Sequence, residues 1–281
     1  MKITNRMGLP QPIVDAVAAD QHDREGATYS VTELIKPPHM LTLERTHEGE
    51  IEEDASDRIF ALLGRAVHSI LESGGNEALS EERLTAVIDG IPVSGALDHY
   101  VLDGGVLSDY KVTSVWAMLR PKPEWVAQTN MYAHLLRAHG HTPTVLRIVA
   151  ILRDWSKPEA RRDPSYPQSQ VVVVDQEAWT PEATEAYMRE RVRLHEAPTH
   201  PICASEERWE RPTTYAVKKP GAAKALRVLP TMPEAEAWIA QNPKAKGADV
   251  ETRPGLNVRC VDYCNVAPWC SFAQSLKGAA P

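Results

Sequence analysis

Residues 93–111 read VSGALDHYVLDGGVLSDYK, and this segment determines the fold expected for the chain. Apolar residues alternate on both sides of the turn formers Asp103-Gly104-Gly105, which predicts a β-hairpin. Asp98 ends the first predicted strand, and Asp109 and Lys111 lie on the returning strand. Because strand side chains alternate with period two, Asp109 and Lys111 face the same side of the sheet. Two carboxylates and an ammonium on one patch suit a divalent cation beside a phosphate.

The same three residues in isolation have a simpler interpretation, because a short Asp-x-Lys motif is more often a surface salt bridge than a catalytic site.

The composition excludes few alternatives. The chain has 281 residues, of which 43% are hydrophobic and 25% are charged, as in a soluble protein with one large core or two small ones. Long apolar runs and an apolar N-terminal signal region are absent from the sequence, so we expect a cytoplasmic protein that does not enter a membrane.

The formal net charge of −7 argues weakly against a nucleic-acid partner, but the charge is unevenly distributed. Residues 1–110 carry 8 Lys and Arg against 20 Asp and Glu, whereas residues 111–227 carry 18 against 13. The segment that follows the hairpin is therefore basic. It is compatible with a phosphate-binding surface, and equally with a solvated face.

Upstream of the hairpin, apolar residues recur at helical spacing from about Ser56 to Ser73, and Gly74-Gly75 ends the predicted helix. His68 and Glu72 are four residues apart and share a face of this helix. A lone helical histidine is usually a surface residue or a satisfied core residue. The alternative is that His68 reaches the two acids of the hairpin.

The remaining pattern predicts an α/β fold with a central mixed β-sheet flanked by helices. Residues 1–28 are expected to be an arm or loop, and the acidic run 48–57 a solvated loop. Residues 154–168 are predicted to be a polar loop. Helices are predicted from Ser30 to Pro37 and over about 123–138 and 181–195, and strands over 86–88, 144–152 and 170–174. The helix over 123–138 carries Gln128 and Tyr132 as an i, i+4 polar pair, which could also simply reach water at a helix edge.

Four short motifs follow one another in this order: GRAVHSILE with His68, GALD with Asp98, DYK with Asp109 and Lys111, and QTNMY with Gln128 and Tyr132. In their order, spacing and placement they resemble the PD-(D/E)xK nuclease superfamily. The similarity is to its RecB-like branch, which includes phage exonucleases and CRISPR adaptation nucleases. It covers about residues 30–196 and again the C-terminal cysteines. Asp109 stands where many relatives have Glu, which is a tolerated variant.

This resemblance implies a restriction-endonuclease-like core and a metal-dependent DNA nuclease. His68, Asp98, Asp109 and a backbone carbonyl after Tyr110 or Lys111 would hold Mg²⁺ or Mn²⁺. Lys111 would orient or deprotonate the attacking water. Gln128 and Tyr132 would contact the DNA backbone or support the site, and Glu72 is a further acid near it. A phage or prophage exonuclease acting in recombination or replication, with a protein partner from those processes, is the favoured activity. The alternatives are a structure-specific or nicking endonuclease of the same fold and a non-catalytic DNA-binding relative.

The four cysteines are Cys203, which stands alone, and Cys260, Cys264 and Cys270, which form a C-x3-C-x5-C cluster. In a cytoplasmic chain, clustered thiols favour a metal centre over disulfides. The RecB-like resemblance implies a [4Fe–4S] cluster, although the distant cysteine of the relatives precedes the nuclease core and Cys203 follows it. Zn²⁺ and uncoordinated thiols remain the alternatives.

The domain organisation expected from these patterns has an arm over residues 1–29, a nuclease core over 30–200 and a cysteine-bearing appendage over 201–281. Within the appendage, residues 214–217 and 225–229 predict a hairpin around Lys218-Lys219-Pro220-Gly221, and a helix follows from Thr231 to about Gln241. This inserted module is expected to have little apolar surface of its own. Its Lys and Arg side chains could contact nucleic acid or face water.

Overall fold

The chain forms two compact units, Met1–His200 and Pro201–Pro281, each described here by itself. The computed structural model describes residues 1–19, 24–72, 78–119 and 122–278. The predicted helix end at Gly74-Gly75 lies outside these residues. No helix in the described ranges combines the length and the apolar character needed to cross a membrane.

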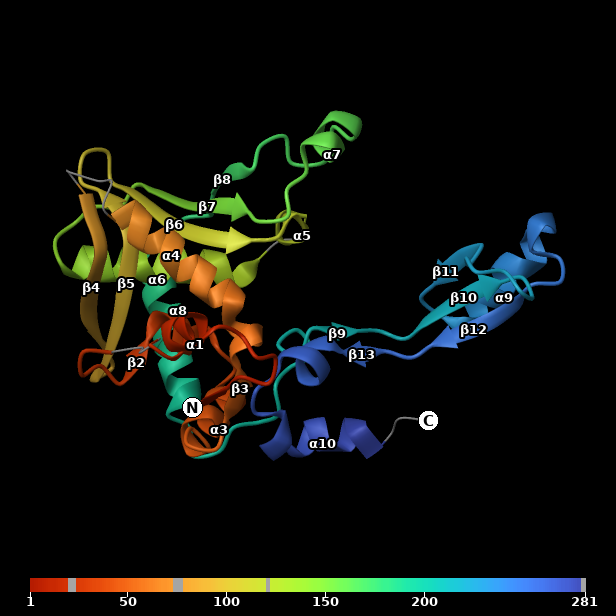
Figure 1. The fold of residues 1–281 in the computed structure, drawn as a ribbon, viewed down its shortest axis with the longest axis horizontal. Coiled ribbons are helices and arrows are strands. Elements are labelled where there is room, and N and C mark those ends of the chain that lie inside the picture. The colour runs from red at the N-terminus through yellow and green to blue at the C-terminus, as the bar shows by residue number, and fades with distance from the viewer. Residues whose placement is uncertain (20–23, 73–77, 120–121, 279–281) are drawn as a thin grey trace. The chain divides into compact units, whose positions relative to one another are not determined.

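Unit 1 is an α/β structure built on a mixed sheet flanked by helices (Figure 1). In its described part the sheet has six strands in the order β2-β5-β6-β7-β8, with β4 paired to β5. Their bounds are Tyr29–Ser30 for β2, Ala78–Ile88 for β4, Ile91–Val101 for β5, Val106–Thr113 for β6, Val145–Leu152 for β7 and Val171–Asp175 for β8. The pairs β4–β5, β5–β6 and β7–β8 are antiparallel, whereas β6–β7 and β2–β5 are parallel.

The sheet of unit 1 has helices on both faces, and further helices lie in its connections. The helices are α1 Gln11–Ala18, α2 Val31–Ile35, α3 Pro38–Thr46, α4 Ile59–Glu72, α5 Val115–Met118, α6 Pro123–Ala138, α7 Lys157–Arg162 and α8 Pro181–His195. Helix α4 packs against β5 and β6, and α6 packs across β4 to β7. In Figure 1 α4 lies in front of the strands and α6 lies behind them. The main core fills the space between the sheet and α2, α6 and α8, with Leu97, Leu107 and Met131 fully buried in it.

The predicted hairpin is present, because β5 and β6 pair antiparallel through Val101↔Val106, Tyr100↔Leu107 and His99↔Ser108. Gly105, with φ +62°, approaches the neighbouring loop so closely that an added Cβ would lie 2.3 Å from the carbonyl oxygen of Thr142. The turn therefore requires glycine there for both conformation and space. One detail differs from the expectation: β5 continues to Val101, so Asp98 lies inside the strand and not at its end.

Several segments that the sequence pattern left as loops are ordered elements. Residues 1–28 include β1 Lys2–Thr4 and α1, and β1 pairs in parallel with β3 Glu52–Asp54 in the acidic run. Asp54 explains this pairing, because its carboxylate accepts hydrogen bonds from Thr4 Oγ1 and the Arg6 backbone N–H. The loop over 154–168 contains α7. Strand β4 is longer than the predicted 86–88, because its polar half continues the pairing with β5.

Helix α2 begins with a capping box, and this motif fixes the position of the start of α2 beside β5. Ser30 Oγ accepts from the Glu33 N–H, and the Glu33 carboxylate accepts from the Ser30 N–H. Arg24 holds the buried Glu33 carboxylate with two hydrogen bonds of 2.6 and 2.9 Å. The cap and the ion pair together place Ser30 and Thr32 beside β5.

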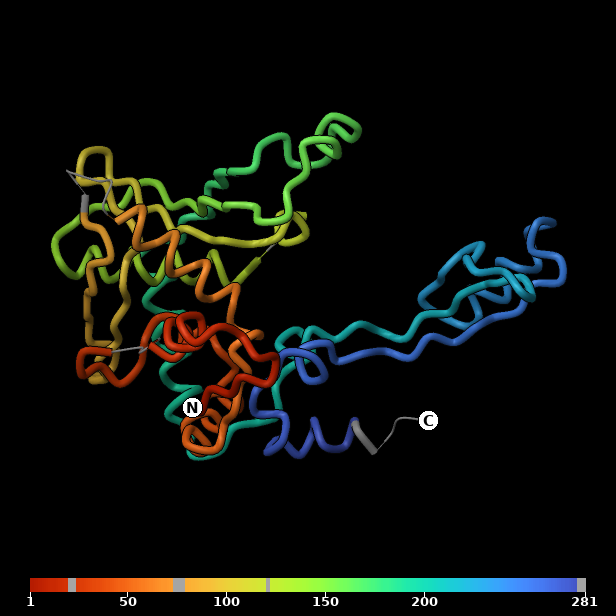
Figure 2. Tube along the Cα trace, viewed as in Figure 1, coloured from red at the N-terminus to blue at the C-terminus, as the bar shows by residue number. Residues whose placement is uncertain are grey.

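Unit 2 contains a three-stranded sheet in the order β11-β10-β12, formed by β10 Thr214–Lys218, β11 Arg227–Leu229 and β12 Asp249–Arg253, with α9 Met232–Gln241. The trace in Figure 2 runs along β10 and returns along β12. The two-stranded ribbon β9 Glu210–Arg211 with β13 Leu256–Asn257 and helix α10 Ser271–Gly278 complete the unit. The predicted hairpin and helix are confirmed, but β12 was not anticipated. The expectation of little apolar surface is wrong, because Val217, Ala235 and Ala245 form a buried cluster with partly buried Trp238 and Ile239.

Gly95 on β5 is a packing constraint that can be tested directly. A Cβ at this position would lie 2.6 Å from Tyr132 Cε1, whereas a Cβ at Gly64 on α4 would have nothing within 4 Å. We expect Gly95→Ala to destabilise the protein by about 1–3 kcal/mol because the Tyr132 ring must shift. Gly64→Ala, in a helix interior, should stabilise it by about 0.5–1 kcal/mol. Urea unfolding of both variants measures the difference, and equal effects of the two substitutions would contradict the packing argument.

His195 at the end of α8 makes the stability of unit 1 depend on pH. Burial and, next, the nearby Arg191 lower the pKa of His195 to about 4, and its Nε2 lies 3.2 Å from the Leu34 carbonyl oxygen. Below about pH 6.5 the unfolded chain binds a proton that the folded chain does not, so stability is lost as the pH falls from about 6.5 to about 4. The loss is on the order of 3 kcal/mol.

The test compares the free energy of unfolding of the wild type and His195→Gln between about pH 7.5 and pH 4. We expect the wild type to lose more stability than the variant in this window. Carboxylate titration affects both proteins equally and cancels in the difference. Parallel curves for the two proteins would show that His195 is not the responsible group.

Candidate functional site

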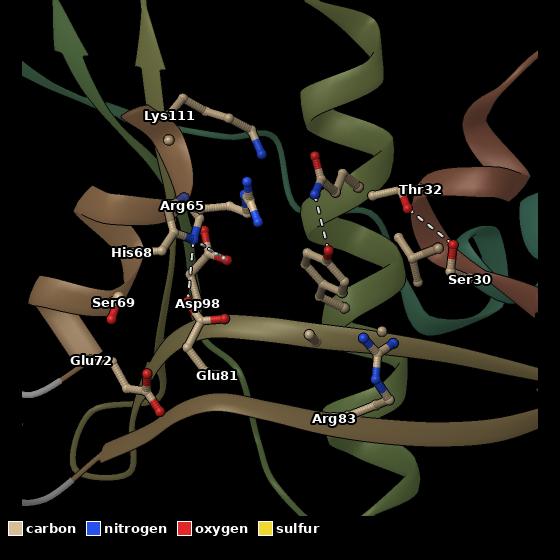
Figure 3. A pocket seen from close by; sticks show the side chains of 16 residues that line it. Ser30, Thr32, Arg65, His68, Ser69, Glu72, Glu81, Arg83, Asp98 and Lys111 are labelled. Carbon is tan, nitrogen blue, oxygen red and sulfur yellow. Dashed lines mark hydrogen bonds and ion pairs between the residues drawn. The ribbon is translucent and has the colours of Figure 1, made fainter. Parts of the chain in front are cut away.

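A pocket opens along one edge of β5, between the residues that pair with β2 and the residues that pair with β6. On that edge β2 pairs with residues 93–94 and β6 pairs with residues 99–101, and the described sheet has no strand beside the residues between them. The cavity there has a volume of about 510 Å³. Figure 3 shows its walls, which come from α2, α4, β4, β5, β6 and α6. The pocket is thus a consequence of sheet topology and not of a surface loop.

Asp98 occupies the point where β5 and β6 separate. Its Oδ2 accepts a 2.6 Å hydrogen bond from the backbone N–H of Tyr110. The pairing of β5 with β6 ends at His99 and Ser108, so the carboxylate replaces the backbone acceptor that β5 does not offer to Tyr110. The side chain is 10% exposed. Its other oxygen remains directed toward His68, as Figure 3 shows.

His68 reaches from α4 across to both strands. Its Nδ1 lies 3.2 Å from Glu81 Oε1 and 3.4 Å from Asp98 Oδ1, and its Nε2 lies 3.1 Å from the Tyr110 carbonyl oxygen. Hydrogen bonds to Asp98 and then to Glu81 raise the pKa of His68 to about 10. The structure therefore brings together His68 and Asp98, which the sequence pattern singled out, with a backbone carbonyl next to them.

Glu81 on β4 is the site residue that sequence reasoning missed. The register of β4 and β5 places it directly opposite Asp98, and this is the one position skipped between the pairs Ser80↔His99 and Glu82↔Leu97. The backbone of Glu81 is left-handed, with φ 50°, which is uncommon for a residue other than glycine. One ligand atom each from Glu81, His68 and Asp98 lies within 4.8 Å of the other two, a spacing that could hold a metal ion.

Asp109 and Lys111 share a face of β6 as the alternation requires. Lys111 Nζ lies 2.6 Å from Asp109 Oδ2 as an ion pair, but outside hydrogen-bond geometry, so neither oxygen of the buried carboxylate has a hydrogen-bond partner among the described residues. Burial raises the pKa of Asp109 to about 6, although Lys111 opposes this shift. Lys111 lines the pocket. Asp109 lies behind it and does not belong to the group formed by His68, Glu81 and Asp98.

Gln128 and Tyr132 form the wall contributed by α6. Gln128 Nε2 donates a 3.0 Å hydrogen bond to Tyr132 Oη, and both side chains line the pocket. The predicted i, i+4 pair therefore exists, and neither side chain simply reaches water, since both residues are buried. Burial raises the pKa of Tyr132, so its hydroxyl stays protonated.

The pocket carries both signs of charge. Lys111, Arg65, Arg83 and the protonated His68 are its cations, while Glu81, Asp98 and Glu72 are its acids. Arg83 is held by a 3.3 Å hydrogen bond to Ser94 Oγ, and Arg65 donates to the Ala16 carbonyl oxygen at 2.7 Å. In Figure 3 the acids and His68 lie at one end, with Arg83 farther along β4. This arrangement can accommodate a divalent cation beside an anionic group.

The four cysteines of unit 2 are thiols, and Cys260, Cys264 and Cys270 lie near enough to Cys203 to act on its charge, although no three Sγ atoms among the described residues lie within 4.8 Å of one another. Burial, then Glu207, and then Cys270, Cys264 and Cys260 raise the pKa of Cys203 to about 11. Two arginines connect the segments that carry them. Arg208 donates to the Cys203 carbonyl oxygen and to Asn257 Oδ1, and Arg259 donates to the Glu207 carbonyl oxygen. These side-chain hydrogen bonds hold the segment that follows Cys203 beside the segment that leads to Cys260.

Comparison with known proteins gives little guidance. No family model matches the chain, and no curated protein matches it. Among solved structures it is similar to "Crystal structure of SSO0001", with a TM-score of 0.45 and 16% sequence identity over 67% of this chain and 85% of that one. The functional interpretation therefore depends on the geometry of the site.

Proposed function

We propose that unit 1 is a metal-dependent DNA nuclease with a PD-(D/E)xK core. The observation that carries this proposal is the facing pair Glu81 and Asp98, both within reach of His68 Nδ1 in a pocket that Lys111 also lines. Like charges placed directly opposite on neighbouring strands repel each other. A cation between them removes this repulsion, and carboxylate oxygens with an imidazole nitrogen suit Mg²⁺ or Mn²⁺.

The donor set fits such an ion. Glu81 and Asp98 supply side-chain ligands, His68 would supply a third when the ion displaces the proton that its raised pKa retains, and the Tyr110 carbonyl oxygen lies beside them. When bound, the metal would lower the pKa of a coordinated water and polarise the scissile phosphate. Asp109 holds Lys111 by its ion pair, and it senses the charges of the centre, because Asp98 raises and His68 lowers the pKa of Asp109.

The protein side chains account for the remaining steps. Lys111 orients the attacking water and offsets the charge that develops on the phosphate. Arg65 and Arg83 bind the flanking anionic groups of the substrate, and Gln128 and Tyr132 hold the wall against which the backbone lies. An exonuclease of a phage or prophage, used in recombination or replication, is the activity we propose. End-labelled linear and covalently closed circular DNA with Mg²⁺, Mn²⁺ or EDTA distinguish it from an endonuclease, since a nicked circle identifies the latter.

Substitution of a proposed metal ligand and substitution of Lys111 should have different effects on Mn²⁺ binding and on the cleavage rate. Asp98→Asn and Glu81→Gln should weaken Mn²⁺ binding, measured by electron paramagnetic resonance titration, and reduce cleavage together with it. Lys111→Ala should reduce the cleavage rate by about 10²–10⁴-fold, while Mn²⁺ affinity and DNA binding in Ca²⁺ persist. Asp109→Asn should also slow cleavage, by no more than Lys111→Ala does, because it releases Lys111.

Glu82→Gln is the matched control, since Glu82 is the exposed neighbour on the same strand and its side chain points to the opposite face. It should leave metal binding and cleavage unchanged. A Glu81→Gln protein that binds Mn²⁺ as tightly as the wild type would remove Glu81 from the ligand set. Wild-type cleavage by Asp98→Asn would remove the nuclease proposal itself.

We also propose that the four thiols of unit 2 hold a [4Fe–4S] cluster, with Zn²⁺ as the alternative. Burial and the neighbouring cysteines raise the pKa of Cys203 and Cys260, and a bound cation would offset this cost by stabilising the thiolates. The centre would be structural, because it would close the loop that contains the inserted module.

Protein purified without oxygen should then be brown, with broad absorbance near roughly 400 nm and about four irons per chain. Colourless protein with about one Zn²⁺ per chain would identify zinc instead. Cys264→Ser should lower the melting temperature in either case. A metal-free protein whose melting temperature is unchanged by Cys264→Ser would rule out both centres.

A further inference from the structure

The inserted module of unit 2, residues 214–253, is a small folded body with an uneven charge distribution. Helix α9 packs on one face of β11-β10-β12 through Ala235, Trp238 and Ile239. The module carries 7 Lys and Arg against 4 Asp and Glu, although the whole chain has a net charge of −7. The module therefore has a positive net charge in a chain whose net charge is negative. The strand topology shows where its cations lie.

The strand register gathers the cations at one end of the module. Strand β10 is antiparallel to both neighbours, with Val217 opposite Arg227 and Lys218 opposite Asp249. The end of β10 and the beginnings of β11 and β12 therefore meet at the same edge. The loop that joins β10 to β11 and the turn that leads from α9 into β12 both project there. These two connections contribute Lys219, Lys224, Lys244 and Lys246, and together with Arg227, the first residue of β11, these residues are here called the basic end.

The acids of the module lie elsewhere or are already paired. Glu234 and Glu236 are in the first half of α9, which starts after β11 and thus at the opposite end of the sheet. Glu251 pairs with Lys218 at 3.2 Å and with Arg253 at 2.9 Å. The five side chains of the basic end are exposed, and within the described part of the chain none has an ion pair. Asp249 and the already paired Glu251 line one pocket with Lys219.

Folding of the module does not require this concentration of charge. The core consists of apolar residues, and the five cations lie outside it. The α9 dipole favours a cation in its last turn, but this effect decays within one turn and does not reach the loop of Lys219 and Lys224. Crowded like charges destabilise a compact body by mutual repulsion. A bound polyanion relieves that repulsion.

We propose that the basic end binds the phosphate backbone of a nucleic acid. Exposed lysines on flexible stems contact phosphates without reading base sequence, and their binding is driven by release of counterions. The choice of nucleic acid among polyanions rests on the proposed function of unit 1. The contact itself is a second binding site, made by residues outside the pocket, and it anchors substrate independently of the chemistry.

The experiment uses the full chain in the Asp109→Asn background, so that little DNA is consumed during the measurement. Binding of a fluorescein-labelled DNA duplex and of its single strand is followed by anisotropy over a series of salt concentrations. The test variant replaces Lys219, Lys224, Lys244 and Lys246 by Gln, and the matched control replaces the same four lysines by Arg. The melting temperatures should agree because all four side chains are exposed.

We expect the Gln variant to bind DNA more weakly and with a shallower slope of log Kobs against log salt. Each lost phosphate contact reduces the slope by about 0.7–0.9, so four contacts reduce it by up to about 3.6. The Arg variant should keep the affinity and slope of the parent. Unchanged DNA binding by the Gln variant would overturn the proposal. So would loss of binding to phosphatidylserine vesicles by this variant while its DNA binding persists, since that result assigns the basic end to a membrane.

This outcome is separable from the fate of the nuclease proposal. With Asp109 intact, the Gln variant should still cleave a saturating concentration of short DNA at the rate of the wild type, with a raised KM. If the protein cleaves DNA in a metal-dependent manner but the Gln variant binds DNA as tightly as its parent, the basic-end proposal alone is rejected. An effect on DNA binding in a protein that cleaves nothing would reject the nuclease proposal alone.

Discussion

Two carboxylates, Glu81 and Asp98, face each other across neighbouring strands, and the organisation of unit 1 around the pocket depends on balancing them. Carboxylates in that position repel, so the fold surrounds them with positive and hydrogen-donating groups. His68 from α4 supplies one such group, and the Tyr110 N–H from β6 supplies another. These contacts attach α4 to the sheet at the point where β5 leaves β6. The left-handed backbone of Glu81 indicates that local strain is accepted to keep this carboxylate in place.

The hairpin and the later helices could be predicted because their signals are local. Alternation around Asp103-Gly104-Gly105 indicated the hairpin, and α6 and α8 begin at Pro123 and Pro181, the first-turn prolines that mark helix starts. Their existence needs no long-range information. The same holds for Asp109 and Lys111, whose shared face follows from strand geometry alone.

Glu81 could not be found in this way, because its role depends on register between two strands. The sequence around it, ALSEERL, has no alternation and its acids look like those of a solvated segment. Only pairing with β5 along its full length places Glu81 opposite Asp98. The approach of the segment of Cys203 to the C-terminal cysteines is equally non-local, since the Arg208 side chain donates to Asn257 and the Arg259 side chain donates to the Glu207 carbonyl oxygen. The error about the inserted module has a related cause, because strand, helix and turn each contribute only a few apolar residues to its core, and only the folded sheet brings them together.

The charge balance of the chain shows why a sum over residues is a poor guide to its partners. Residues 1–200 carry 20 Lys and Arg against 30 Asp and Glu, and residues 201–281 carry 11 against 8. A cation-binding centre needs concentrated acids, and such acids oppose the approach of a polyanion. The pocket answers this conflict locally, because Lys111, Arg65 and Arg83 lie within the same cavity as Glu81 and Asp98. Exposed charges are screened beyond a distance of about 8–10 Å at physiological salt. The remaining acids of unit 1 therefore repel a nucleic-acid strand bound in the pocket only weakly. The arrangement of charges within one Debye length therefore decides binding, and an acidic protein with this arrangement is compatible with a nucleic-acid substrate.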